Sequence, residues 1–269
     1  MAKISSEERH QYFDKLKPYR ETIESIVSRE RKMRVEIHKS SNGSAHKKIS
    51  LSDDMLNLAS LYIIISTISQ SMLKVKNEDA LNDARKTLYK AVIYMEEVVT
   101  DLVDAPYSEY EEKLVEIEDV TAAQRYELVR KMGLAIQLLE NAYGDNTKWR
   151  WSFVDLEGRF AAVAKNIFNL KKAVGNTDPR SPDYEPTVYH LRLIKKLLMQ
   201  AADRFREKYE LSTNRFDDFK MGINFLQALR RINALMGDRD EAETVKKKYE
   251  IWTTKLEADM KKLEESKKA

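Results

Sequence analysis

The side chains best suited to metal or acid–base chemistry in this sequence are few. Histidine occurs only at His10, His38, His46 and His190. Glu7 and His10 have the Glu-x-x-His spacing found in dinuclear metal sites of helical bundles, but those sites need two such motifs and facing carboxylates. The second motif is missing, as is the HExxH motif of zinc proteases. The histidines therefore predict no metal site.

Two aspartate pairs, Asp53-Asp54 and Asp217-Asp218, resemble the pairs that bind magnesium-diphosphate in helical terpenoid synthases. The third acid of such a motif is absent after both pairs, and acids at the start of a helix are also favoured by its dipole. The chain has no Gly-rich phosphate loop, no GxSxG motif and no cysteine, which excludes a thiol nucleophile. We expect no catalytic residue and no cofactor.

The segment 29–48 is strongly basic, with seven lysines and arginines against two glutamates. As a nucleic-acid arm it would neutralise phosphates and bind with strong salt dependence. As a docking patch it would meet an acidic protein surface, and as a solvated helix end it would only complement the negative pole of the helix dipole. The candidate residues are Arg29, Arg31, Lys32, Arg34, Lys39, Lys47 and Lys48.

Residues 96–119 form the opposite block, with ten acids against one lysine. Such a block sets a local potential that steers partners. It would pair with the basic segment inside one chain or with that of a second copy, and it would repel a nucleic acid unless it lay on the far face. The candidate residues are Asp104, Glu109, Glu111, Glu112 and Glu116.

Three tryptophans are the aromatic candidates for an interface. Trp149 and Trp151 alternate around Arg150 at the start of an expected helix, and aromatic side chains beside a cation stack on bases or anchor protein contacts. The alternative is a hydrophobic staple that packs the helix entry onto the core. Trp252 lies on a nearly heptad-spaced apolar seam in the last expected helix, which suits either a core helix or a coiled-coil contact.

The elements that must position these residues are helices. Seven glycines and five prolines leave little material for the turns of a β fold, and strong helix formers replace them. Capping signals and apolar spacing predict helices over 5–39, from 52 to about 73, 78–104, 108–118, 121–143, 152–174, 187–210, 213–236 and 239–266. We expect an all-α, irregular antiparallel bundle of about eight or nine helices; the intervals between helix starts also suit stacked helix pairs, without a repeat consensus.

Two details of the first helices bear on the basic segment. Pro18 should kink or divide the first helix, and the apolar spacing of that helix is interrupted at Glu30. A basic loop is expected at 39–51, with Ser52 and the two following aspartates at the next helix start. Because Asn42-Gly43 suits a hairpin turn, a hairpin is the alternative, but no other strand is predicted for it to join.

The stretch 55–73 has no charged residue and is long enough to cross a membrane. Its many serines, with Asn57 and Gln70, favour a buried central helix instead, so no membrane span is expected. The Pro-rich segment 177–186 is the strongest break in the chain. It divides an N-terminal helical region, 1–176, from a C-terminal helical region, 187–269, that packs on the first or stands apart.

These patterns predict a cytoplasmic, non-enzymatic protein that acts as a scaffold or assembly component, with a protein partner or self-association, through charged and aromatic helical surfaces. A nucleic-acid-binding protein that uses the basic segment 29–48 is the alternative. A helical enzyme without a recognisable motif is the third hypothesis.

Overall fold

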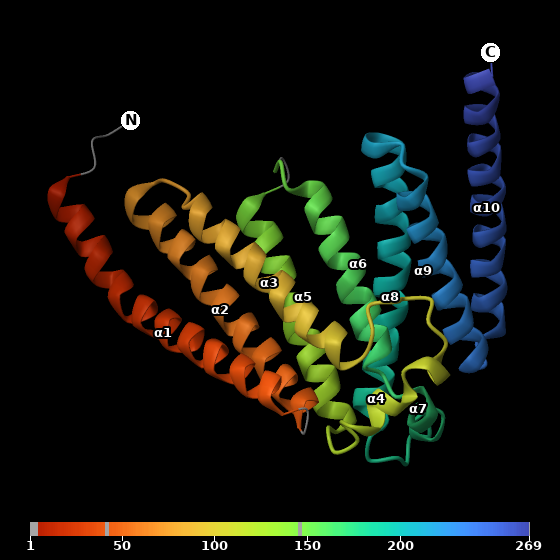
Figure 1. Ribbon diagram of the computed structural model, residues 1–269, viewed down its shortest axis with the longest axis horizontal. Coiled ribbons are helices and arrows are strands. Elements are labelled where there is room, and N and C mark those ends of the chain that lie inside the picture. Colours follow the sequence, from red (N-terminus) through yellow and green to blue (C-terminus); the bar gives the residue numbers. More distant parts are fainter. Residues whose placement is uncertain (1–4, 41–42, 145–146, 269) are drawn as a thin grey trace. The chain divides into compact units, whose positions relative to one another are not determined.

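The protein is all-α, and a computed structural model describes its residues 5–40, 43–144 and 147–268. Figure 1 labels the helices, and the described residues contain no strand. Their bounds are α1 (Ser6–Lys39), α2 (Ser44–Leu73), α3 (Glu78–Val98), a 3₁₀ turn (Tyr107–Glu109), α4 (Glu111–Val115), α5 (Ala122–Tyr143), α6 (Arg150–Asn166), α7 (Leu170–Asn176), α8 (Tyr184–Lys208), a π-helical turn (Tyr209–Thr213), α9 (Phe216–Leu235) and α10 (Arg239–Lys268).

The expected class is confirmed, and the described residues hold ten α-helices because one expected helix is divided. The predicted helix 152–174 becomes α6 and α7, which are separated at Asn169. The Asn169 side chain accepts a hydrogen bond from the Lys172 backbone N–H at 3.1 Å. A side-chain acceptor of this kind is typical of a helix N-cap, so α7 begins as a new element.

Helix α1 is continuous from Ser6 to Lys39. Its capping box is present, since the Glu8 N–H donates to the Ser5 hydroxyl at 3.1 Å and the Ser5 N–H donates to the Glu8 carboxylate at 2.8 Å. Pro18 lies inside the helix and does not divide it. The Thr22 hydroxyl donates to the Pro18 carbonyl at 2.9 Å.

The predicted start of the second helix was wrong. Helix α2 begins at Ser44, so the basic loop expected at 39–51 is confined to the few residues before it, of which 41–42, including Asn42 of the hairpin alternative, lie outside the described residues. Ser52 is buried in the middle of α2, and its hydroxyl donates to the Ala91 carbonyl of α3 at 2.9 Å. Asp54 is buried as well and forms an ion pair with Arg29 of α1. These side chains hold helices together and do not cap one.

The described chain divides into two compact units. The first unit comprises Met1–Val99, Val115–Asp119 and Glu127–Arg150. In it α2 packs against both α1 and α3, and one of its apolar clusters joins the start of α1 to the end of α2. The members of this cluster are Tyr12, Leu16, Ile65, Ile68 and Ala80. Helix α2 is long and apolar enough to cross a membrane by length and composition, although a large part of that stretch is buried inside the structure.

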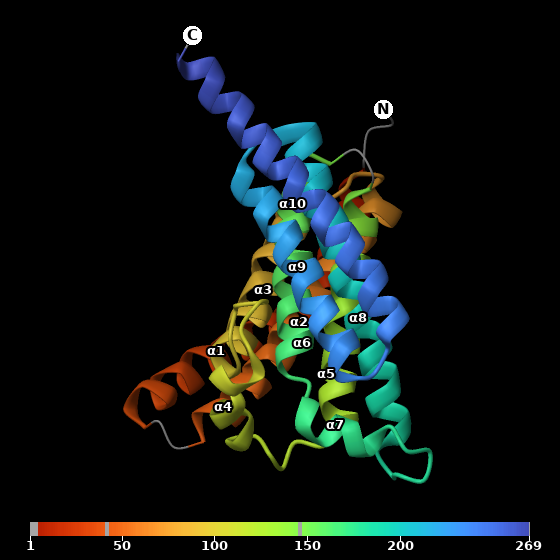
Figure 2. The same cartoon turned by 90° about the vertical axis from the view of Figure 1, so that its right-hand side faces the viewer.

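The second unit comprises Thr100–Leu114, Val120–Tyr126 and Trp151–Ala269. Helix α9 packs against α8 and α10, and the three helices lie side by side in both Figures 1 and 2. The approach of α9 to α8 is close at Gly222, where an added Cβ would lie 3.0 Å from the Ala202 carbonyl oxygen. The Pro-rich segment 177–186 lies inside this unit, and the domain boundary that the sequence indicates there stays a prediction.

A π-helical turn joins α8 to α9. The Asn214 N–H donates to the Tyr209 carbonyl at 3.0 Å, five residues back, and Asn214 has a φ of 50°. The Tyr209 ring stacks on Phe219 of α9 with centroids 4.9 Å apart. Its hydroxyl donates to Asp259 of α10 at 3.1 Å. The Tyr209 side chain at this turn therefore contacts both α9 and α10.

Two buried polar residues at the end of α6 hold the segment 100–105 in the second unit. The Lys165 ammonium donates to the carbonyls of Val103 and Ala105 at 2.7 and 3.1 Å. The Asn166 amide donates to the carbonyls of Thr100 and Leu102. Burial, with the nearby Arg231 charge acting in the same direction, lowers the pKa of Lys165 to about 8.

Candidate functional site

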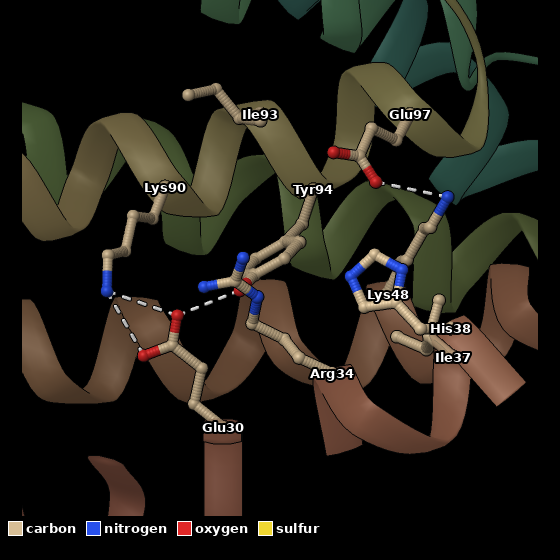
Figure 3. A pocket seen from close by; sticks show the side chains of 9 residues that line it. All are labelled: Glu30, Arg34, Ile37, His38, Lys48, Lys90, Ile93, Tyr94 and Glu97. Atoms are coloured by element: carbon tan, nitrogen blue, oxygen red, sulfur yellow. Dashed lines mark hydrogen bonds and ion pairs between the residues drawn. The ribbon is translucent and has the colours of Figure 1, made fainter. Parts of the chain in front are cut away.

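A pocket of about 390 Å³ opens between α1, α2 and α3 in the first unit. Figure 3 shows its side chains, which come from α1, the first turns of α2, and α3. Two of the lining residues are isoleucines, one from α1 and one from α3, and the other side chains are charged or polar. The lining residues are Glu30, Arg34, Ile37, His38, Lys48, Lys90, Ile93, Tyr94 and Glu97.

Glu30 is the most buried charged residue of α1, only 4% exposed. Lys90 lies 3.1 Å from each of its carboxylate oxygens, and the Tyr94 hydroxyl donates to it at 2.8 Å. A buried carboxylate is stable only when its oxygens are paired, and α3 supplies both partners. Burial and the Glu30 carboxylate raise the pKa of Tyr94, so this hydroxyl stays a donor.

Replacing Tyr94 by phenylalanine should lower the free energy of unfolding by about 1.5–3 kcal/mol, the usual range for a hydrogen bond to a charged group. The change removes the Tyr94 hydroxyl donor and leaves the contacts of Lys90 with Glu30 in place. Urea unfolding of the two proteins measures the difference. Tyr62→Phe in α2 is the control, because Tyr62 is partly buried, although less than Tyr94, and its hydroxyl makes no hydrogen bond within the described residues. Equal losses in both variants would contradict a special role for the Glu30 contact.

A second ion pair lies at the other end of the pocket, where Lys48 of α2 is 3.1 Å from Glu97 of α3. The carboxylates of the pocket are thus occupied by Lys48, Lys90 and Tyr94. Arg34 and His38 have no carboxylate partner among the described residues. With three cationic side chains against two carboxylates, the pocket has an excess of positive charge before His38 is considered.

The outer face of α1 beside the pocket presents an apolar residue within a ring of basic ones. Val35 is 52% exposed. On a helix the neighbours of a residue are those three and four positions away. For Val35 all four are basic or histidine: Arg31, Lys32, His38 and Lys39. All four are exposed, and none has an ion pair within the described part of the chain. We call Val35 and these four residues the Val35 face.

The sequence of the chain matches one protein family. A family model described as the TP0443 family matches residues 8–260, nearly the whole sequence. The chain belongs to the TP0443 family. No curated protein and no solved structure matches it. The pocket and most of α1, with the whole Val35 face, lie inside the part that defines this TP0443 member.

The predicted basic residues of this TP0443 member divide into two groups. Three of them are already paired with acids: Arg29 with Asp54, Lys47 with Glu36 and Lys48 with Glu97. The other four are exposed and unpaired within the described residues: Arg31, Lys32, Arg34 and Lys39. Among the seven predicted basic residues, those that remain available to a partner therefore all lie on α1.

Two contacts among the described residues join the basic segment 29–48 to the acidic segment 96–119 within one chain. Lys48 pairs with Glu97, and the His46 ring lies 2.8 Å from Asp119. The five predicted acidic residues are divided between the units: Glu116 belongs to the first, while Asp104, Glu109, Glu111 and Glu112 belong to the second. Glu111 is paired with Lys171 at 2.8 Å, and Glu109, Glu112 and Glu116 are exposed.

The three predicted aromatic residues differ in exposure. Trp149 is half-buried in the first unit, with the Arg85 guanidinium 4.0 Å from its ring centroid. Trp151 is also half-buried and begins the α6 part of the second unit. Trp252 is buried, 2% exposed, so its side chain belongs to the core of the second unit and offers no exposed contact.

The structure also places the residues weighed for metal chemistry. His10 is exposed and lies 3.4 Å from Asp14, and Asp218 pairs with Lys208 at 3.0 Å. Within residues 5–40, 43–144 and 147–268 no group of three or more metal-ligating side chains is arranged to hold an ion.

Sequence reasoning did not assemble the pocket. Lys90, Tyr94 and Glu97 stand about sixty residues from Glu30, among many other charged residues. One signal was present, because Glu30 interrupts the apolar spacing of α1. A charge at a core position requires a buried partner, but the sequence does not tell which residue supplies it.

Proposed function

We propose that the protein is a non-enzymatic interaction or scaffold protein that binds an acidic surface of a protein partner through the Val35 face of α1. The observation that carries this proposal is the exposed valine with three basic side chains and a histidine at its four neighbouring helix positions. Protein interfaces combine an apolar centre with a polar rim that excludes water from it. The Val35 face has this arrangement on the scale of two helical turns.

The difference between the paired and the unpaired cations of the basic segment supports this proposal. Arg29, Lys47 and Lys48 stabilise the contacts between helices, whereas the cations around Val35 have no partner in the described chain. A partner with acidic residues around an apolar side chain would supply both missing contacts. Opposite potentials of this kind mainly increase the rate of association and the specificity.

A nucleic-acid partner is the second candidate, because the exposed cations Arg31, Lys32 and Lys39 of the same face would neutralise phosphates. It makes no use of Val35, since a phosphate backbone offers no apolar surface. The paired acids Glu30 and Glu36 on the same helix also reduce the positive potential along α1. We therefore place the protein partner first.

Two changes on the Val35 face test these candidates: the first tests whether the face binds at all, and the second distinguishes the two partners. The triple variant Arg31→Glu, Lys32→Glu, Lys39→Glu should abolish binding to either partner. Val35→Ala should weaken a protein complex roughly tenfold, since it removes about half of the apolar side chain from the contact, and should leave nucleic-acid binding unchanged. A photo-crosslinking residue at position 35 identifies the partner, and the affinity of the purified pair is then measured by calorimetry.

The matched control is the charge reversal Lys15→Glu with Lys17→Glu, on the exposed first half of α1. It lowers the net charge by about four units, against about six for the triple variant, and leaves the Val35 face intact. Binding that falls equally in the control would reflect general charge and would reject the proposed face. Binding to random-sequence DNA that is steeply salt-dependent and insensitive to Val35→Ala would support the nucleic-acid candidate instead.

A further inference from the structure

We propose that the pocket between α1, α2 and α3 is a binding site for an oxyanion of the phosphate class. The ligand is inorganic phosphate or the phosphoryl group of a monoester, and Arg34 is the residue that determines its binding. This inference goes beyond the protein partner and does not require one.

The donors of the pocket come from three different helices. Arg34 and His38 project from α1, Lys48 from α2 and Lys90 from α3 (Figure 3). The ammonium groups of Lys48 and Lys90 each have three protons, and the contacts to Glu97 and Glu30 leave some of these unused. The guanidinium of Arg34 has five N–H groups, and within the described residues none of them meets a carboxylate.

The charge balance of the pocket favours an anion over a cation. A bound cation would face three permanent cations, and both carboxylates are already engaged. Glu30 is fixed by two partners, so it holds Lys90 in place and contributes little free negative charge. Glu97 is half-exposed, and an incoming dianion would share Lys48 with it. Arg34 supplies the charge that remains uncompensated.

The shape of the pocket suits a ligand of this class. Its volume of about 390 Å³ is within the range of small-molecule sites, roughly 300–1,000 Å³. Ile37 of α1 and Ile93 of α3 add apolar surface to the lining beside the charged groups. An arginine fork matches two oxygens of a phosphate at once, which a point-charge lysine does not.

Titration of the full chain with inorganic phosphate tests this inference. Sodium chloride is added so that the ionic strength stays constant as the phosphate concentration rises. We expect saturable shifts of the amide signals of residues 34–38 and 90–97 in ¹⁵N-labelled protein. Arg34→Gln should weaken phosphate binding by at least about tenfold, the effect of losing one charge-assisted contact. Arg34→Lys should retain part of the binding, because it keeps the charge and loses the fork.

Arg31→Gln is the matched control. It removes the same charge from the same helix one turn away, outside the pocket, and should leave phosphate binding unchanged. The melting temperatures of all variants without phosphate verify that they are folded. Amide shifts that do not saturate in the wild type would overturn the proposal. An affinity for phosphate that falls equally in Arg31→Gln and Arg34→Gln would overturn it as well.

A second titration distinguishes the source of the oxyanion. Glycerol phosphate that binds more tightly than inorganic phosphate would identify a phosphoryl group on a larger molecule, and the reverse order would identify the free ion. Both results depend on Arg34 if the inference is correct. Neither depends on Val35, so Val35→Ala separates a failure here from a failure of the proposed protein contact.

Discussion

Replacing Trp252 by alanine should lower the free energy of unfolding by about 3–5 kcal/mol, the range for truncating a fully buried tryptophan. The indole is 2% exposed and packs on Phe219 of α9 with ring centroids 5.7 Å apart. Arg206 of α8 and Lys248 of α10 each lie 5.0 Å from its ring. The variant would leave a cavity where three helices meet, and urea unfolding followed by circular dichroism measures the loss.

Ile251→Ala is the control for this change. Ile251 is the preceding residue and is 66% exposed, so its truncation should change stability by no more than about 0.5 kcal/mol. This pair of variants also tests the assignment of Trp252 to the core. If Trp252→Ala lowers the free energy of unfolding by less than about 1 kcal/mol and impairs self-association, Trp252 belongs to an interface and not to the core.

Acid should destabilise the second unit through His190. This histidine is fully buried, its Nε2 lies 3.0 Å from the Ala164 carbonyl as the donor, and its ring meets Phe168 edge-on at 5.0 Å. Burial lowers its pKa from 6.5 to about 4, and the nearby Arg125 charge adds to this effect. Above pH 6.5 both the folded and the unfolded protein hold this ring neutral, so it contributes no pH dependence there.

Between pH 6.5 and 4 the unfolded chain takes up a proton that the folded protein does not. The free energy of unfolding therefore falls with falling pH, by up to about 1.4 kcal/mol per pH unit and about 3 kcal/mol in total. Urea unfolding of the wild type and His190→Gln across this range, starting from neutral pH, measures it. Carboxylates titrate equally in both proteins, so the difference between the two curves isolates His190. Parallel curves would contradict the prediction.

The helical class was predictable because its causes are local. Few glycines and prolines, capping boxes and apolar spacing act within a few residues. The boxes at Ser5–Glu8 and Thr121–Gln124 are both present, with the Gln124 N–H donating to Thr121 at 3.2 Å. Local patterns of this kind determine where a helix can begin, and at these two positions nothing distant competes with them.

The start of α2 shows where local patterns fail. Ser52 followed by two aspartates has the composition of a helix N-terminus, yet these residues lie in the middle of α2. Ser52 bonds a carbonyl of α3, and Asp54 pairs with Arg29 of α1. A polar residue that serves as a cap and one that serves as a bridge between helices are the same in sequence. Only the tertiary partner distinguishes them.

In the candidate site, too, the role of a polar residue depends on its tertiary partner and not on its local sequence. Four of the predicted basic residues remain exposed, but their local sequence does not differ from that of the three that form ion pairs. The difference arises from which face of α1 or α2 meets another helix. The pocket adds partners from α3 that no spacing within α1 could reveal.

The π-helical turn between α8 and α9 has a consequence for sequence variation in the family. A π-turn corresponds to one extra residue inserted in an α-helix. One residue is about 100° of helical rotation and about 1.5 Å of rise. A relative one residue shorter between Tyr209 and Thr213 would end α8 in a regular α-helical turn, and the chain would leave α8 in a different direction. Asn214 and Arg215 lie outside regular helix between α8 and α9, so the change would reach Phe219 through this connection and not as a rotation of one continuous helix. Such a deletion would change how Phe219 meets the Tyr209 ring and, through Phe219, the contact with Trp252. We therefore expect the length of this turn and the identity of these aromatic residues to vary together among relatives.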